Sequence, residues 1–139
     1  MNRDNHWIVN VLEYVTLNST ATRKKVGAII VKDYNFIVGQ GFNSMPRTAE
    51  NQACEDECGK TRSDVIHAEA KAITNAAMNG YSTKDATLYC TIPPCPVCCG
   101  LIIEAGISRV VYKDKYWSET NLSLLTNAGI TVEHFKDGY

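Results

Sequence analysis

Two short motifs contain the residues best suited to bind a metal ion. His67-Ala68-Glu69 supplies an imidazole and a carboxylate, and Pro94-Cys95-Pro96-Val97-Cys98 supplies two thiols three residues apart. Each motif directly precedes a segment with a helical pattern. Cysteines three residues apart on a first helical turn project from one face, and the exposed N–H groups and the helix dipole there favour the thiolate. The two thiolates, together with His67, are therefore predicted to bind one divalent metal ion.

The ligand types identify the ion. Two thiolates and one imidazole form a three-ligand zinc set. A structural zinc site has four protein ligands, whereas a catalytic site leaves one position to water or substrate. No fourth ligand is evident beside His67, Cys95 and Cys98 in the sequence. We therefore expect one catalytic Zn²⁺ per chain.

Glu69 is predicted to handle protons instead of binding the metal. It lies two residues after His67 and so cannot share its helix face, yet it stays close to whatever binds beside the ion. A water acidified by zinc needs a base, the substrate needs an acid, and one carboxylate can serve as both. Either motif alone is a weak signal. Together, His-x-Glu and Pro-Cys-x-x-Cys are the signature of zinc nucleobase deaminases, in which the glutamate is not a ligand.

Length and composition restrict the class of protein. The 139 residues, 45% hydrophobic and 21% charged, predict a single domain over residues 1–139 with one core. No apolar run approaches the ~20 residues that span a bilayer, and Arg3 and Asp4 stand where a signal peptide would be apolar. A formal charge of −1 lacks the basic excess of proteins that bind long nucleic acids. We expect a cytoplasmic protein with no membrane partner.

Hydrophobic periodicity predicts an α/β fold. Helices are predicted over 4–18, 67–80, 96–105 and 118–128, and strands over 26–32, 36–41, 87–91, 109–112 and 131–135. Turn residues between the first two strands indicate an antiparallel hairpin, and the later alternation with helices indicates parallel crossovers. Residues 42–63 lack periodicity and are interpreted as a functional loop. The expected architecture is a five-stranded mixed sheet with helices on both faces.

The chain from about residue 4 to 136 resembles the deoxycytidylate deaminase family, within the wider cytidine deaminase fold. Besides the two metal motifs, residues 23–33 (RKKVGAIIVKD) are similar to the family's first strand, and residues 41–46 (GFNSMP) to its Gly-Tyr-Asn-Gly-x-Pro loop. Residues 103–107 (IEAGI) and 114–116 (DKY) complete the likeness. The resemblance implies a three-layer α/β/α cytidine deaminase-like fold.

The resemblance also implies an activity. Members of this family convert dCMP to dUMP by hydrolysis with release of ammonia, which supplies the precursor of dTTP. The family is usually homohexameric, activated by dCTP with Mg²⁺ and inhibited by dTTP. Carried over by position, His67, Cys95 and Cys98 hold zinc, Glu69 moves protons, and the Ala68 backbone contacts the pyrimidine carbonyl.

Further contacts follow from the resemblance and from charge. Asn43 is expected to meet the sugar, and Tyr116 to close over the bound nucleotide. The basic run Arg23-Lys24-Lys25 can supply charge-assisted hydrogen bonds to a 5′-phosphate or to an effector. Phe42 and Ser44 belong to the same candidate group for effector or phosphate binding, and they stand where the family has tyrosine and glycine.

Other interpretations stay open at this point. The substrate could be free cytidine or deoxycytidine, or adenosine in a tRNA, although the tRNA alternative conflicts with the lack of basic excess. From another class, a zinc-stabilised binding module would leave Glu69 unexplained. Some viral members of the family carry a second, structural zinc, and Cys54 and Cys58 in the long loop suggest one here, although no histidine lies between 58 and 67.

Overall fold

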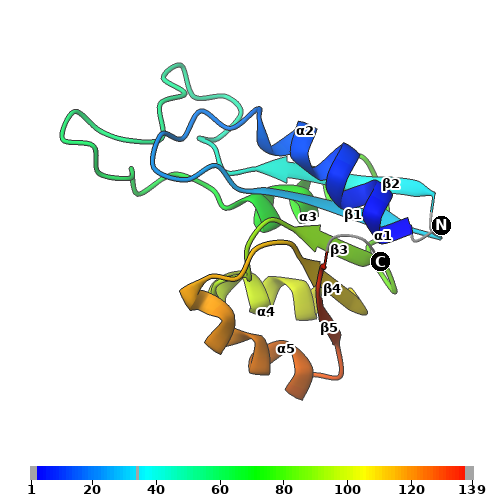
Figure 1. The fold of residues 1–139 in the computed structure, drawn as a ribbon. Helices are drawn as coiled ribbons and strands as arrows, with labels where there is room; N and C mark the ends of the chain where they lie inside the picture. Colours follow the sequence, from blue (N-terminus) through cyan, green and yellow to red (C-terminus); the bar gives the residue numbers. More distant parts are fainter. Residues whose placement is uncertain (1–2, 34, 137–139) are drawn as a thin grey trace.

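A five-stranded mixed sheet forms the centre of the computed structural model, which describes residues 3–33 and 35–136 (Figure 1). The strand order is β2-β1-β3-β4-β5. The strands are β1 (Gly27–Lys32), β2 (Phe36–Phe42), β3 (Thr87–Cys90), β4 (Arg109–Tyr112) and β5 (Thr131–His134). β1 pairs antiparallel with β2 and β3, and β3, β4 and β5 are parallel. The predicted mixed sheet with its initial hairpin is confirmed.

Helices cover both faces of the sheet, so the predicted three-layer α/β/α fold is also confirmed (Figure 1). A helical run at the N-terminus packs on one face, and α3, α4 and α5 pack on the other. The helical elements are α1 (Arg3–Asn5), the π-helix η1 (His6–Leu12), α2 (Glu13–Thr16), α3 (Ala68–Met78), α4 (Pro96–Glu104), the 3-10 helix η2 (Trp117–Asn121) and α5 (Leu122–Asn127). Within the described residues, no helix is long and apolar enough to cross a membrane.

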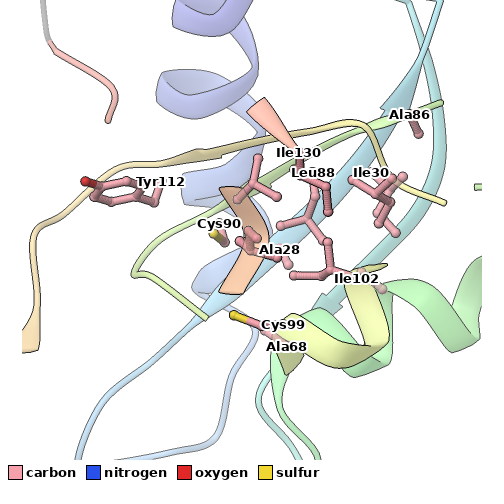
Figure 2. Close-up of a cluster of buried hydrophobic side chains, with 14 of the residues drawn as sticks. Ala28, Ile30, Ala68, Ala86, Leu88, Cys90, Cys99, Ile102, Tyr112 and Ile130 are labelled. Carbon is pink, nitrogen blue, oxygen red and sulfur yellow. The ribbon is translucent and has the colours of Figure 1, made fainter. Parts of the chain in front are cut away.

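The two layers of core explain why the strands are apolar at consecutive positions. Ile30 faces α3 and α4 and joins Leu88 and Ile102 in the larger cluster (Figure 2). Its neighbour Ile29 faces the N-terminal helix and joins Leu12 in the smaller cluster. Because successive side chains of a strand point to opposite faces, a sheet buried on both faces needs apolar residues at every position.

Two segments differ from the predicted elements. The last helix, predicted from 118, begins as the 3-10 turn η2, and α5 starts only at Leu122. No side-chain hydrogen bond caps its start, and the intervening serine, threonine and asparagine are weak helix formers. In the predicted hairpin turn, Asp33 adopts the left-handed conformation (φ 53°), while Tyr34 lies outside the described residues.

A partly buried ionic network connects the N-terminal helix to the sheet. The guanidinium of Arg109 donates to the two carboxylate oxygens of Asp4 at 2.9 and 2.6 Å, and to Glu133 at 3.1 and 2.9 Å. The Tyr89 hydroxyl donates to the same Asp4 at 2.6 Å. Burial opposes ionisation of Asp4, but the hydrogen bonds from Arg109 and Tyr89 outweigh it and lower the pKa of the carboxyl. Asp4 thereby joins α1 to β3 and β4, and Arg109 extends the network to β5.

Replacement of Asp4 tests this network. Asp4→Asn keeps the shape of the side chain but leaves Arg109 without its buried anionic partner. We expect the free energy of unfolding at pH 7 to fall by about 2–4 kcal/mol in urea denaturation. The matched variant Glu133→Gln removes the more exposed partner and should cost about 1 kcal/mol or less. Equal losses of unfolding free energy in Asp4→Asn and Glu133→Gln would contradict the larger contribution assigned to Asp4.

The pH dependence of the same variant has a defined sign. Because the pKa of folded Asp4 is lowered, its contribution is complete above its ordinary value of 3.8 and is lost as pH falls through the folded value. The stability difference between wild type and Asp4→Asn should therefore stay constant near neutral pH and shrink below about pH 4. A difference that persists unchanged in acid would contradict the assignment.

Candidate active site

The three predicted metal ligands come together at the beginnings of two helices. His67 precedes α3 and Cys95 precedes α4, both with extended backbone, and Cys98 lies one turn into α4. The Nδ1 atom of His67 lies 3.4 Å from the Cys95 sulfur and 3.5 Å from the Cys98 sulfur. All three potential ligand atoms lie within 4.8 Å of one another.

These distances fit a tetrahedral zinc ion. With Zn–S of about 2.3 Å and Zn–N of about 2.0 Å, tetrahedral angles separate sulfur from nitrogen by about 3.5 Å. Charge leads to the same conclusion. Burial and the nearby Glu69 carboxylate raise the pKa of the Cys98 thiol. A cluster of acidic groups with one imidazole lacks positive charge, and Zn²⁺ would supply it.

Glu69 is buried beside this cluster, with 3% of its surface exposed. It is the second residue of α3, and no ligand role is open to it on the face used by His67. Burial raises the pKa of its carboxyl, although hydrogen bonding with Cys98 and the charge of His67 oppose this effect. The carboxylate is thus a desolvated acid or base next to the three metal-ligand side chains, and its role in moving protons stays a prediction.

A pocket of about 460 Å³, called here the active-site pocket, opens beside the cluster. His67, Cys95 and Glu69 line it together with buried Ala68. Exposed side chains of Arg23, Lys24 and Tyr116 line it as well. The Lys24 ammonium lies 5.7 Å from the centre of the Tyr116 ring, a cation–π contact between a residue predicted for phosphate or effector binding and one predicted for substrate binding.

Asn43 also lines this pocket, but most of its amide is used by the protein. Its Oδ1 accepts hydrogen bonds from the Ser19 hydroxyl at 2.7 Å and from Val26 N–H at 2.9 Å. Its Nδ2 donates to the Lys24 carbonyl at 2.8 Å. One N–H is left for a ligand, so Asn43 chiefly holds the chain that carries Lys24.

The remaining candidates are divided between two pockets. Phe42 and Ser44 line a second pocket of about 560 Å³, which Asn43 between them does not line. Arg47 and Lys71 supply its positive charge. Lys25 is exposed and lines neither pocket. The group of residues predicted for effector or phosphate binding therefore does not form one site.

Several residues that line the active-site pocket were not predicted. Glu55, Thr61 and Val65 come from the long loop (residues 43–66), and Ile92 and Pro93 follow β3. No local pattern marks them, because their position depends on the long loop folding back against residues 19–26. The acidic run around Glu55, inside a loop already interpreted as functional, is the one signal that could have drawn attention to it.

The two cysteines of the long loop do not form a second metal cluster. Cys54 is buried, with its sulfur 3.4 Å from the Thr20 hydroxyl, whereas Cys58 is exposed. Across residues 3–33 and 35–136, the His67, Cys95 and Cys98 group is the one His/Cys/Asp/Glu cluster compact enough to hold a metal.

A His/Cys/Cys cluster beside a buried glutamate is the arrangement that defines zinc nucleobase deaminases. Comparison with known proteins agrees. The family model for the cytidine and deoxycytidylate deaminase zinc-binding region matches residues 1–114. The chain belongs to the cytidine and deoxycytidylate deaminase family. The predictions of this family, of its fold and of a deaminase of the hydrolase class are confirmed.

The matches with individual relatives cover different shares of the relatives' sequences. ComE operon protein 2 of Bacillus subtilis (strain 168) is 36% identical over 136 residues, covering 93% of this chain and 69% of that protein. Deoxycytidylate deaminase of Saccharomyces cerevisiae is 33% identical over 126 residues, covering 84% of this chain but 40% of its own length. The crystal structure of dCMP deaminase from cyanophage S-TIM5, in complex with dCMP and dUMP, has a TM-score of 0.90 and 32% identity, covering 97% of this chain and 98% of that one.

Metal content tests the ligand set. His67→Ala, Cys95→Ser and Cys98→Ser should each lose zinc or bind it weakly, because a three-ligand site has no spare protein donor. Cys54→Ser and Cys58→Ser should retain one zinc per chain. Atomic emission spectrometry of the purified variants gives the answer. Two zinc ions per wild-type chain, one of them lost with Cys54, would contradict the single site.

Proposed function

We propose that this chain is a zinc-dependent dCMP deaminase, which converts dCMP and water to dUMP and ammonia. The observation that carries the proposal is a single pocket with chemically different parts. The three metal-ligand residues and buried Glu69 suit the pyrimidine, whereas Arg23 and Lys24 suit a 5′-phosphate. The likeness to the cyanophage enzyme bound to dCMP and dUMP, over nearly the whole chain, supports the same substrate.

Different residues of the site have different roles in the hydrolysis. Zinc bound by His67, Cys95 and Cys98 would supply a Lewis acid that makes water a good nucleophile. Glu69 moves the two protons of the attacking water, one to the ring nitrogen N3 and one to the amino group, which then leaves as ammonia. The N–H of Ala68 is in the first turn of α3, where no intrahelical acceptor exists, and is available to the pyrimidine carbonyl.

Other contacts orient the nucleotide. Tyr116 covers the base as an aromatic wall, and the remaining N–H of Asn43 reaches the sugar. Arg23 and Lys24 hold the phosphate through charge-assisted hydrogen bonds. Free deoxycytidine would leave these two cations unused. A tRNA substrate would need a broader basic surface than a chain with a formal charge of −1 offers.

Replacement of Glu69 should reduce turnover without reducing zinc binding. Glu69→Gln keeps the size of the side chain but cannot cycle a proton. We expect one zinc per chain and a turnover of dCMP reduced by roughly 10²–10⁴-fold or more. Turnover is measured from the change in ultraviolet absorbance as dCMP is converted to dUMP. An active Glu69→Gln enzyme with full zinc content would contradict the assigned role.

The phosphate contact predicts a difference between two neighbouring lysines. Lys24→Ala should raise the KM for dCMP by about tenfold, because one charge-assisted hydrogen bond contributes about 1.5 kcal/mol, and should leave the slower use of deoxycytidine unchanged. Lys25→Ala removes the same charge from an exposed position outside the pocket and should change either KM by less than about twofold. Equal weakening of both substrates by Lys24→Ala would contradict a phosphate contact.

The proposal includes regulation at the second pocket. Activation by dCTP with Mg²⁺ and inhibition by dTTP are the family's properties, and the loop at residues 41–46 carries the family pattern. Phe42 and Ser44 line this pocket beside Arg47 and Lys71, a combination of an aromatic ring and two cations that suits a nucleotide. A dCTP titration of dCMP turnover, with and without Mg²⁺, tests this part.

The proposal also includes assembly and location. Val97, on the first turn of α4, is 73% exposed, and Leu101 on α4 and Leu124 on α5 are exposed too, so each helix presents apolar surface. Such a surface supports a homohexamer as the working form. All six cysteines are free, which supports a place in the reducing cytoplasm. In this proposal, residues 1–139 act as one deaminase domain.

A further inference from the structure

We propose that Glu55 is a positioning residue for the substrate phosphate. Its carboxylate holds the backbone of the basic segment (residues 20–25), so that Arg23 and Lys24 face the active-site pocket. The inference rests on the proposed use of dCMP, because it concerns the part of the substrate that deoxycytidine lacks.

Glu55 contacts the basic segment through its backbone N–H groups and through the side chains of Thr22 and Arg23. The Thr22 N–H lies 3.1 Å from each of the two carboxylate oxygens, and the Arg23 N–H lies 3.3 Å from one of them. Partial burial opposes ionisation, but the hydrogen bonds from Thr22 and Arg23 outweigh it and lower the pKa of the Glu55 carboxyl. The bonds are therefore charge-assisted at neutral pH.

The basic segment depends on such contacts because it has no regular structure of its own. It lies between α2 and β1, outside any helix or strand. Asn43 fixes its end, through the Lys24 carbonyl and the Val26 N–H. Glu55 fixes the peptide that leads into Arg23. Long basic side chains have many rotamers, so a fixed backbone limits where their charged ends can reach.

The turn that carries Glu55 supports itself. Asp56 accepts hydrogen bonds from the N–H groups of Cys58 and Lys60, and the Arg62 N–H donates to the Cys54 carbonyl. None of these bonds uses the Glu55 side chain. A substitution at Glu55 is thus expected to release the basic segment and leave this turn folded.

Charge alone would have the opposite effect. Glu55 lines the pocket as an anion, and removing a negative charge near a phosphate site should strengthen binding of dCMP. Loss of the fixed positions of Arg23 and Lys24 should weaken binding of dCMP. The sign of the change in KM therefore distinguishes a positioning role from an electrostatic one.

The experiment compares three variants of the zinc-loaded enzyme with dCMP and deoxycytidine. Glu55→Ala should raise the KM for dCMP by about five- to tenfold with little change in kcat, and should leave kcat/KM for deoxycytidine within about twofold of wild type. Glu55→Gln keeps one acceptor oxygen and should give a smaller rise. Glu57→Gln removes the same charge from an exposed position on the same turn and should behave as wild type.

The outcomes are separable. A KM for dCMP that falls or does not change in Glu55→Ala overturns the inference, and so does an equal loss with both substrates, which indicates general damage to the pocket. Wild-type enzyme that uses dCMP and deoxycytidine equally overturns the proposed function and this inference with it. A wild-type preference for dCMP over deoxycytidine whose size is unchanged in Glu55→Ala overturns the inference alone.

Discussion

The close packing of α3 against the hairpin is the constraint on which the site depends. Gly39 and Gly41 of β2 leave room for it, because a Cβ at Gly39 would lie 2.2 Å from the Ala72 carbonyl oxygen and one at Gly41 would lie 2.6 Å from that of Ala68. Since β2 and β3 both run antiparallel to β1, they are parallel to each other, and the helices that follow them begin at the same edge of the sheet. This places His67 and Cys95 side by side.

The pocket wall depends on a different kind of interaction. The long loop and the basic segment have no ladder between them, and they fix each other through side chains that bond to backbone groups. Asn43 and Glu55 from the loop hold peptides near Lys24 and Arg23, and the Thr20 hydroxyl bonds to the Gln52 carbonyl. The rigid sheet thus supports the reacting groups, whereas the groups that select a substrate lie on irregular chain, where sequence can change without altering the fold.

The sequence predicts local features well and long-range features poorly. The metal motifs mark helix starts, a local property, so the ligands could be found from their spacing. Alternation could also have assigned Asn43 to one pocket and its neighbours Phe42 and Ser44 to the other, because successive residues of extended chain point to opposite sides. Glu55 could not be found in this way, since its contacts lie more than 30 residues away in the chain.

Electrostatics connect the fold to the choice of ligand. Glu69 and Cys98 are both buried, and burial raises the pKa of each, because a desolvated site disfavours negative charge. The helix dipoles of α3 and α4 have their positive ends here and offset part of this cost. A divalent cation offsets more, since it interacts with the thiolates and the carboxylate together. Close approach of these acidic groups is unfavourable in the protein without a metal, and it therefore favours binding of a divalent cation. The folded protein holds the groups in place, which makes the site's affinity for the cation strong.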